Sequence, residues 1–362
     1  MTIVYISHLQ GDIANGLAWS VPASIKAQEK IDNVLWLNTS GAYLDHWSNV
    51  KCFCKSKRLR SLSHLNAPFN KPDVVVFEGF YDDINDVILG YWLRKNRIPY
   101  VIIPRSALTY KALHNHAYLK KCIAHTLFYD SFIKKALALQ YLTLRECEDT
   151  KTVFDCNYFI VPNGIDLPQT TKEFHEGVHS IHAVFVGRID IYQKGLDILL
   201  DAMAEIKDNL VSHQFELIIY GPVTQDYDKV VNLIKEKDLN DIIRMGGQIY
   251  KEEKEKALLA ADLFILTSRF EGLPMGLLEA LSYGLPCAIT DGSNMKQEIE
   301  VSNAGWSAEN NKDSVKSMLL QVLAEKDKLE EKGRSARLLS QKYDWNSIAL
   351  KTHEELSRLL ND

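Results

Sequence analysis

Short apolar runs alternate along most of the chain with segments in which apolar residues recur at helical spacing. In the first half, these runs predict strands at TIVYIS, NVLWLN, DVVVFEG, IPYVIIP, LQYLTL and YFIVPNG. Helical stretches are expected between them, around residues 84–95 and 117–137. This alternation is typical of a parallel sheet with helices on both faces.

The alternation pauses once and then resumes. Residues 168–179, PQTTKEFHEGVH, are polar and contain few aliphatic side chains, so they are expected to link two domains. Beyond this linker, strands are predicted at IHAVFVG, FELIIYG, IIRMGG, DLFILTS and LPCAIT, with helices from Gly195, over 226–237 and over 252–260. The chain is therefore predicted to be an α/β protein with two doubly wound domains, residues 1–167 and 180–341.

Length and charge refine this picture. A chain of 362 residues favours two domains, and 46% apolar with 25% charged residues is typical of a globular protein. The first 170 residues carry 19 Lys and Arg against 15 Asp and Glu, and much of this excess lies in residues 51–60, KCFCKSKRLR. A solvated loop explains this run, and contact with an anionic membrane surface or a phosphorylated acceptor is the sharper alternative.

The cysteines and the N-terminus bear on the compartment. None of the six cysteines forms a C-x-x-C pair, which argues against a zinc site or a disulfide framework and fits a reducing cytosol. The N-terminus lacks the basic region of a signal peptide, and no apolar stretch approaches the roughly 18 residues that span a bilayer. We therefore expect a cytoplasmic protein whose membrane contact, at the inner face, is peripheral.

Residues 268–287, SRFEGLPMGLLEALSYGLPC, combine a strand end, a glycine-containing loop and a short helix. Pro274 suits the first turn of a helix over 274–283, and Gly284 suits the position after its end. The start of such a helix presents unpaired N–H groups and a positive dipole end, which favour a phosphate. Glu271 in the loop and Glu279 inside the helix could then contact the two ends of an elongated ligand.

This segment resembles the E-x7-E region of the retaining family 4 (group 1) glycosyltransferases, which have the GT-B fold. Other landmarks of that family occur in its order: VPNGID (161–166), FVGRIDIYQKGLDILLDA (185–202), LIIYGP (217–222) and AADLFILTSRFEG (260–272). YDWNSIALKTHEEL (343–356) is similar to the terminal helix that crosses back onto the first domain. GDIANGLA (11–18) and residues 98–121 match the family more loosely.

The resemblance implies a fold and a reaction. Residues 1–167 would be an acceptor-binding Rossmann-like domain, facing across a cleft a nucleotide-sugar-binding domain of residues 180–341. Residues 342–362 would form a helix that packs back on the first domain. The implied reaction is retaining, metal-independent transfer of a sugar from a nucleotide diphosphate sugar, a UDP- or GDP-sugar, to a glycan or lipid-linked acceptor. It would serve bacterial surface polysaccharide synthesis (capsule, O-antigen or exopolysaccharide), with no cofactor and no nucleic-acid partner.

The resemblance also assigns roles to residues. Arg188 and Lys194 would stabilise the leaving diphosphate in place of a metal ion, and Glu271 would contact the transferred sugar. Together they are the expected catalytic residues, and Arg105 is expected to bind the acceptor. The expected donor site comprises Gly11, Gly16, Arg188, Lys194, Ile249, Glu271, Gly272, Leu273, Pro274, Met275, Gly276, Leu277 and Glu279, with Glu279 on the ribose hydroxyls.

Several of these residues also have plain structural explanations. Arg188 could pair with Asp190 on the surface, Lys194 and Glu279 could be solvated, and Glu271 could complement a helix dipole.

The tripeptide DYD (226–228) has the Asp-x-Asp form of a metal site, but it is interpreted as the start of a solvated helix. Three histidines of the first domain are interpreted as ordinary polar residues because none matches a family motif: His8, His114 and His116.

Two other functions fit the same fold. A sugar-nucleotide epimerase would convert the donor without an acceptor, and a non-catalytic subunit would bind a nucleotide sugar without turnover. A dinucleotide-dependent dehydrogenase is disfavoured because no G-x-G-x-x-G follows a predicted strand.

Overall fold

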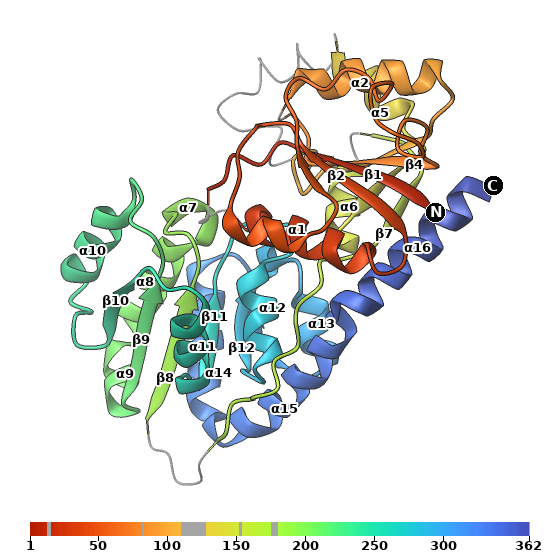
Figure 1. Cartoon of the computed structure of the whole chain (residues 1–362). Coiled ribbons are helices and arrows are strands. Elements are labelled where there is room, and N and C mark those ends of the chain that lie inside the picture. Colours follow the sequence, from red (N-terminus) through yellow and green to blue (C-terminus); the bar gives the residue numbers. More distant parts are fainter. Residues whose placement is uncertain (13–15, 82, 110–127, 152–153, 175–179, 362) are drawn as a thin grey trace. The chain divides into compact units, whose positions relative to one another are not determined.

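The chain forms two compact units in the computed structural model, which describes residues 1–12, 16–81, 83–109, 128–151, 154–174 and 180–361. The first unit comprises Met1–Gly164 together with Trp345–Asp362, and the second comprises Ile165–Asp344 (Figure 1). The described part of the expected linker, residues 168–174, belongs to the second unit and contains no helix or strand.

The first unit contains a parallel sheet of seven strands in the order β3-β2-β1-β4-β5-β6-β7. The strands are β1 (Thr2–Ser7), β2 (Asn33–Asn38), β3 (Phe53–Lys55), β4 (Val74–Glu78), β5 (Tyr100–Ile103), β6 (Ala138–Tyr141) and β7 (Tyr158–Ile160). All six predicted strands are present. Strand β3 was not predicted because it is short, lies at the sheet edge and sits inside the basic run 51–60.

Helices accompany this sheet: α1 (Leu17–Gln28), α2 (Ile84–Lys95), α5 (Asp130–Lys134), α6 (Leu144–Lys151) and α16 (Trp345–Asn361), with the 3-10 turn η1 (Asp45–Asn49). Helix α2 has the predicted bounds, 84–95. The predicted helix 117–137 lies partly outside the described residues. In its described part, only the short helix α5 forms before β6 begins at Ala138.

The second unit contains a parallel sheet of six strands in the order β10-β9-β8-β11-β12-β13. The strands are β8 (Ile181–Val186), β9 (Phe215–Tyr220), β10 (Ile243–Gly247), β11 (Leu263–Leu266), β12 (Cys287–Thr290) and β13 (Gly305–Ala308). The five predicted strands form, and β13 was not predicted. Both sheets are largely buried, as expected for parallel sheets covered on both faces.

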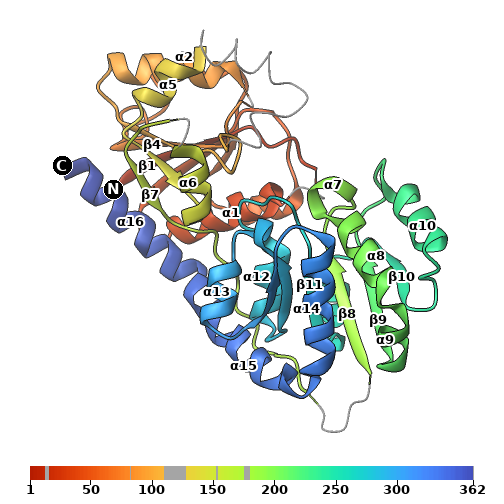
Figure 2. The same cartoon turned by 180° about the vertical axis from the view of Figure 1, so that it is seen from behind.

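Helices cover both faces of the second sheet (Figure 2). They are α7 (Ile191–Lys194), α8 (Leu196–Glu205), α9 (Lys207–Ser212), α10 (Tyr227–Glu236), α11 (Lys251–Ala260), α12 (Met275–Ser282), α13 (Lys296–Val301), α14 (Lys312–Ala324) and α15 (Leu329–Ser340). Among the helices of the described ranges, none combines the length and apolar character needed to cross a membrane.

The C-terminal helix α16 belongs to the first unit and packs against α1. Asp32, whose side chain is fully buried, accepts hydrogen bonds from the N-terminal amine of Met1 at 2.7 Å, from Gln28 and from His353 of α16 at 2.8 Å. Burial alone would raise the pKa of Asp32, but these three donors outweigh it and lower that pKa. The buried carboxylate therefore joins the N-terminus, α1 and α16.

Each sheet has one point at which the strand order reverses. In the first sheet it lies between β1 and β4, and in the second between β8 and β11. Open parallel sheets bind ligands outside the carboxyl ends of the strands at such points. These two positions therefore determine where functional side chains are sought.

Candidate functional site

The loops after β8 and β11 lie at the reversal point of the second sheet. Arg188 follows β8, and the loop from Thr267 to Pro274 joins β11 to α12. A Cβ atom on Gly276, in the first turn of α12, would lie 2.9 Å from the carbonyl oxygen of Val186 at the end of β8. Glycine at this position thus allows the start of α12 to approach the end of β8 closely.

Lys194 and Glu271 form an ion pair at this edge of the sheet. The ammonium Nζ of Lys194 lies 2.5 Å from Oε1 of Glu271, and the hydroxyl of Ser268 donates to the same oxygen at 2.7 Å. The side chains of Lys194 and Glu271 are 13% and 10% exposed, so neither is a solvated surface group. The structure therefore brings together two of the three residues predicted to be catalytic.

Local backbone geometry places Lys194 at this position. Asp190 caps helix α7 by accepting from the amide of Gln193, and Gly195 ends it with a left-handed φ of 62°. A Cβ on Gly195 would lie 2.0 Å from the carbonyl oxygen of Thr267. The hydroxyl of Thr267 in turn donates to the carbonyl oxygens of Lys194 and Gly195. The turn that carries Lys194 is thus packed directly against the loop that carries Glu271.

Arg188 is exposed at the same edge. Its guanidinium donates to Oε1 of Gln193 and lies 3.5 Å from Asp190, so the surface pairing considered for it is present. Gln193 also connects to the loop after β11, because its carbonyl oxygen accepts from the amide of Arg269 at 2.8 Å. Arg188 therefore stands beside the Lys194 turn with its cation open to solvent.

Helix α12 begins at Met275, one residue later than predicted. Pro274 has φ −74° and ψ 115° and is the N-cap, so its extended ψ places it outside the helix. Leu273 and Leu277 are buried, and their side chains pack in the core. A ligand at the start of α12 would meet them only through their backbone.

Asn294 supports the loop and was not predicted from the sequence. Its side-chain amide donates to the carbonyl oxygens of Glu271 and Gly272, at 3.1 Å for Gly272. It adopts a left-handed φ of 60° after the 3-10 turn Asp291–Ser293. The contact could not be predicted because Asn294 lies more than twenty residues after this loop in the sequence. The tripeptide GSN did indicate a turn at this position.

Glu279 also has a partner that the sequence did not indicate. Nζ of Lys254, on α11, lies 2.6 Å from Oε1 of Glu279, and the two side chains are 27% and 23% exposed. Lys254 lies in the run KEEKEK, where each lysine resembles a solvated helix residue. Ile249, expected beside the base, is half-buried in the segment between β10 and α11.

The predicted residues of the first unit have different surroundings. Gly11 has a φ of 81°, which favours glycine, whereas Gly16 is helical and a Cβ there would meet no atom within 4 Å. Residues 13–15 between them lie outside the described residues. A role of either glycine in donor binding stays a prediction.

Arg105 is an internal residue. Its side chain is 5% exposed, and its guanidinium donates to Oε2 of the buried Glu78 at 2.6 and 2.9 Å and to Asn163 at 3.1 Å. These contacts hold the ends of β4 and β5 together. They favour a positioning role over the predicted direct contact with an acceptor.

The remaining candidates do not add to this site. Asp226 precedes α10, where it accepts from Lys229 at 2.8 Å and from the amide of Ile191 at 3.2 Å. Across the described residues, no group of three or more His, Cys, Asp or Glu could hold a metal ion. His114 and His116 lie outside the described residues.

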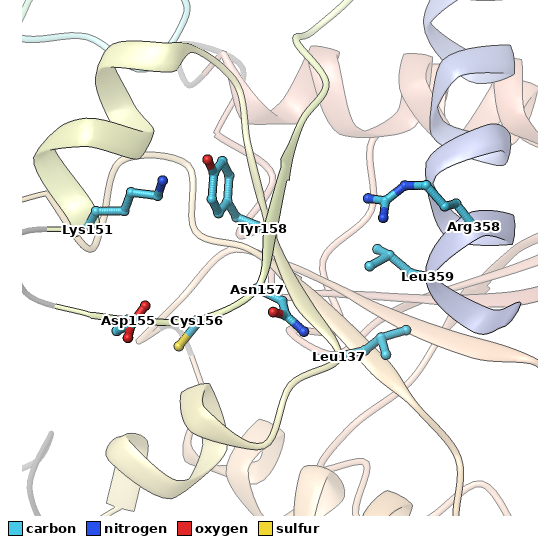
Figure 3. A pocket seen from close by; sticks show the side chains of 8 residues that line it. All are labelled: Leu137, Lys151, Asp155, Cys156, Asn157, Tyr158, Arg358 and Leu359. Carbon is cyan, nitrogen blue, oxygen red and sulfur yellow. The ribbon is translucent and has the colours of Figure 1, made fainter. Parts of the chain in front are cut away.

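A hollow of about 740 Å³ in the first unit lies elsewhere (Figure 3). Leu137 and Asn157, which line it, directly precede β6 and β7, so it lies at the amino ends of these strands. Its two basic residues are engaged, with Lys151 Nζ 3.8 Å over the ring of Tyr158 and Arg358 paired with Glu355 at 2.9 Å. The hollow is therefore distinct from the sheet edge where ligands are expected.

Comparisons with known proteins agree with the motifs. The family model "Glycosyl transferases group 1" matches residues 171–338. The chain is 27% identical over 152 residues to the amylovoran biosynthesis glycosyltransferase AmsK of Erwinia amylovora, covering 40% of this chain and 36% of that protein. It is 26% identical over 256 residues to the lipopolysaccharide 1,6-galactosyltransferase of Escherichia coli, covering 69% of this chain and 65% of that protein.

The fold is also shared with a solved structure. Anabaena Alr3699/HepE, in complex with UDP and glucose, aligns with a TM-score of 0.74 and 16% identity over 99% of this chain and 100% of that one. The two Rossmann-like units therefore form a GT-B fold. The chain spans about a third of the length of AmsK and about two thirds of that of the galactosyltransferase.

Proposed function

We propose that this chain is a retaining glycosyltransferase that uses a nucleotide diphosphate sugar as donor. The observation that carries the proposal is the Lys194–Glu271 pair at the reversal point of the second sheet, beside the exposed Arg188. This edge combines cations for a diphosphate, a carboxylate for sugar hydroxyls and the start of a helix. The family match over residues 171–338 covers this whole site.

Charge development explains what the two cations would do. As the bond between the sugar and the diphosphate breaks, negative charge grows on the leaving oxygen. Arg188 and Lys194 would stabilise this charge more in the transition state than in the ground state, in place of a metal ion. Glu271 holds the ammonium of Lys194 in position beforehand and would bind hydroxyls of the transferred sugar.

The chemical step that we propose follows a front-face route. The acceptor oxygen forms a bond to the anomeric carbon on the face from which the diphosphate leaves, so the anomeric configuration is retained. The bond between the anomeric carbon and the phosphate oxygen breaks, and the proton of the acceptor hydroxyl passes to that phosphate oxygen. No external acid, base or cofactor is consumed.

The nucleoside would lie toward α11 and α12. Glu279 would accept hydrogen bonds from both ribose hydroxyls, and Lys254 would keep its carboxylate oriented. Ile249 offers apolar contact to a base, and such contact does not select one base. UDP- and GDP-sugars are the donors to test first, and the UDP bound by the structural neighbour HepE favours UDP-sugars.

We propose a glycan or lipid-linked acceptor in bacterial surface polysaccharide synthesis. The names of the amylovoran and lipopolysaccharide enzymes support this acceptor class. The placement that we propose is cytoplasmic, at the inner face of the cell membrane, because lipid-linked acceptors are presented there. If the acceptor is a glycan that is not attached to a lipid, the reaction does not require contact with the membrane.

A membrane contact would use the first unit. The five Lys and Arg of residues 51–60 are all exposed, and Arg60 donates to Asn85 on α2 at 3.0 Å. Helix α2 exposes an apolar stripe at helical spacing next to this run: Ile84, Ile88 and Tyr91. Exposed cations beside an apolar stripe match the surface of an anionic bilayer.

Vesicle flotation tests this contact. The protein should float with vesicles containing phosphatidylglycerol and not with pure phosphatidylcholine vesicles. A Lys51→Gln, Lys55→Gln, Lys57→Gln variant should lose most of the binding. Equal flotation of this variant and the wild type would count against a role of the basic run.

The central experiment combines binding and turnover. Thermal-shift screening against UDP-, GDP-, ADP- and dTDP-sugars should identify one stabilising donor. With that donor and saccharide acceptors, Ala variants at Arg188, Lys194 and Glu271 should lose transfer about 100-fold, by analogy with the loss of an oxyanion-hole donor. Exposed Lys256 on α11 provides the control substitution. Transfer near the wild-type level in all three variants would refute the proposed roles.

The alternative functions give different results in the same assay. An epimerase would convert the free nucleotide sugar when no acceptor is present. A non-catalytic subunit would be stabilised by a donor but would show neither transfer nor donor hydrolysis. Product analysis by NMR also reports the anomeric configuration, which decides between retention and inversion.

A further inference from the structure

His8 lies at the reversal point of the first sheet. It directly follows β1, the strand between β2 and β4 (Figure 1). Ser7, the last residue of β1, pairs with Asn38 and Glu78 at the ends of those two strands. This is the position at which an open parallel sheet binds a ligand. The sequence alone gave no reason to separate His8 from an ordinary polar histidine.

The contacts of His8 favour one tautomer of its ring. Nδ1 lies 3.0 Å from the hydroxyl oxygen of Thr39. That hydroxyl also lies 3.1 Å from the carbonyl oxygen of Ser7, which can only accept, so a hydrogen on Nδ1 is the arrangement that satisfies all three groups. The neutral imidazole then carries its hydrogen on Nδ1 and a free lone pair on Nε2. The described residues place no hydrogen-bond partner on Nε2.

Asp83 adds a negative charge on the Nδ1 side. Its Oδ2 lies 3.8 Å from Nδ1 of His8, and the side chains of His8 and Asp83 are 21% and 13% exposed. Its Oδ1 accepts from the amide and the side chain of Asn85 and thereby caps helix α2. The carboxylate is therefore held in place, and its negative charge beside the ring disfavours an anion at this position.

Hydrogen bonds hold the segment that follows His8 in place. Buried Asn38 accepts from the amide of Leu9 at 2.8 Å and donates to the carbonyl oxygen of Leu9 at 3.1 Å. Glycines with positive φ follow the neighbouring strands, Gly41 after β2 and Gly79 after β4. A Cβ on Gly41 would lie 2.9 Å from Cε of Lys57, so this glycine allows the Lys57 side chain to pack against the loop after β2.

We propose that Nε2 of His8 accepts a hydrogen bond from a saccharide hydroxyl of the acceptor, and that Asp83 is the positioning residue for this contact. A hydroxyl donates to a lone pair, whereas a phosphate oxygen is itself an acceptor and would be repelled by Asp83. The part of the acceptor bound here is therefore an uncharged saccharide unit. This inference rests on the proposed function, because it names the acceptor class of the same reaction.

The bound hydroxyl is a neighbour of the one that is glycosylated. In the proposed front-face step, the attacking hydroxyl gives its proton to the leaving phosphate, so its hydrogen is not available to His8. Contact with an adjacent hydroxyl would orient the sugar ring and so aim the attacking oxygen. Loss of this contact should raise the acceptor KM and leave donor binding unchanged.

Two isosteric variants test the contact in the full chain. His8→Asn keeps a donor near the position of Nδ1 but lacks an atom at the position of Nε2, whereas His8→Gln keeps an acceptor near Nε2. The probes are methyl glycosides of glucose, galactose and mannose, with the 6-phosphates of the same sugars as a second arm. His8→Asn should raise the KM for a methyl glycoside about tenfold, the loss expected for one hydrogen bond, with partial rescue in His8→Gln.

Asp83→Asn separates charge from structure. Asn caps a helix as well as Asp does, so stability should be unchanged while the acceptor KM rises and discrimination against the 6-phosphates weakens. His64→Asn, at an exposed position of the same unit, is the matched control and should behave as the wild type. Wild-type acceptor kinetics in His8→Asn would overturn the proposal, as would tighter use of the 6-phosphates by the wild type.

A spectroscopic measurement tests the state of His8 independently of whether the protein is a glycosyltransferase. Long-range proton–nitrogen NMR of the imidazole rings at pH 8 should show His8 protonated on Nδ1, with Nε2 shifting when a methyl glycoside is added. A hydrogen on Nε2 would overturn the proposal whatever the activity. If the wild type binds no nucleotide sugar, the proposed function fails instead, while this spectrum still decides the state of His8.

Discussion

The ammonium of Lys194 lies 2.5 Å from the carboxylate of Glu271, although the two residues are 77 positions apart in the chain. Strand order brings them together, since β8 and β11 are neighbours in the second sheet and each residue lies in the segment after one of these strands. The pair is the part of the candidate site that the proposed reaction requires most directly.

Removing either member of the pair should have coupled effects. Lys194→Met and Glu271→Gln should each lower kcat about 100-fold, because a charge aimed at the transition state is lost or left unpaired. Since they act as one unit, the double variant should lose far less than the product of the two losses. Steady-state kinetics measure this, with Lys256→Met as control. A loss of about 10⁴-fold in the double variant would mean that the two residues act independently.

Lys254 should affect donor binding rather than chemistry. Lys254→Met removes the cation 2.6 Å from Glu279, so the carboxylate loses its fixed orientation. Titration calorimetry with the donor should show a dissociation constant raised about tenfold, which corresponds to about 1.4 kcal/mol, with kcat within about twofold of the wild type. Lys256→Met, two residues away on the exposed face of α11, should bind the donor normally. Equal affinities of the two variants would rule out an orienting role for Lys254.

Gly195→Ala should destabilise the second unit. The new Cβ would lie 2.0 Å from the carbonyl oxygen of Thr267, and the residue would keep a left-handed φ of 62°. Backbone strain and displacement should cost about 3 kcal/mol, seen as an earlier unfolding transition in urea. Gly16→Ala, where φ is −55° and a Cβ meets nothing within 4 Å, should unfold as late as the wild type or later. Similar unfolding of the two variants would show that the turn can rearrange.

Arg105→Ala should act mainly on stability. It leaves the carboxylate of Glu78 buried without its partner, a change that typically costs roughly 3–5 kcal/mol. Chemical denaturation measures this cost, and Arg97→Ala, at an exposed position, is the control. An Arg105→Ala variant of wild-type stability with a raised acceptor KM would instead support the acceptor contact predicted from the sequence.

Asp32 should make the first unit sensitive to acid. Its pKa in the folded protein is lowered below the ordinary value of 3.8, so the unfolded chain binds its proton first as the pH falls. The resulting stability is present above about pH 4 and is lost as the pH falls through the lower folded pKa. Urea unfolding between pH 7 and pH 2.5 measures this loss.

Asp32→Asn is the variant that isolates this contribution. It should destabilise the protein by about 2–3 kcal/mol at neutral pH and flatten the acid dependence, because hydrogen bonds to a charged group are replaced. Asp155→Asn, at an exposed position of the same unit, should leave both unchanged. An acid dependence in Asp32→Asn as steep as in the wild type would assign the effect to other carboxyls.

Most of the fold could be predicted from local patterns. Buried parallel strands are short apolar runs, so eleven strands were predicted at or near their positions, and α2 had its predicted bounds. Strand β3 was not predicted because its three residues lie at an exposed sheet edge within a basic run. This run contains neither a continuous apolar stretch nor an alternation of apolar and polar residues. The start of α12 shifted by one residue because the ψ of Pro274 is extended.

The sequence by itself determined the alternation of elements and the identity of the motif residues, among them Lys194, Glu271 and Glu279, because both depend on neighbours in the chain. Only the tertiary structure decided which groups meet. Lys254 pairs with Glu279, Arg105 turns inward to Glu78, and Thr39 forms a hydrogen bond with His8. Each of these contacts joins two different elements or the segments that follow them. Partner choice depends on strand order and helix packing, which the spacing of apolar residues does not encode.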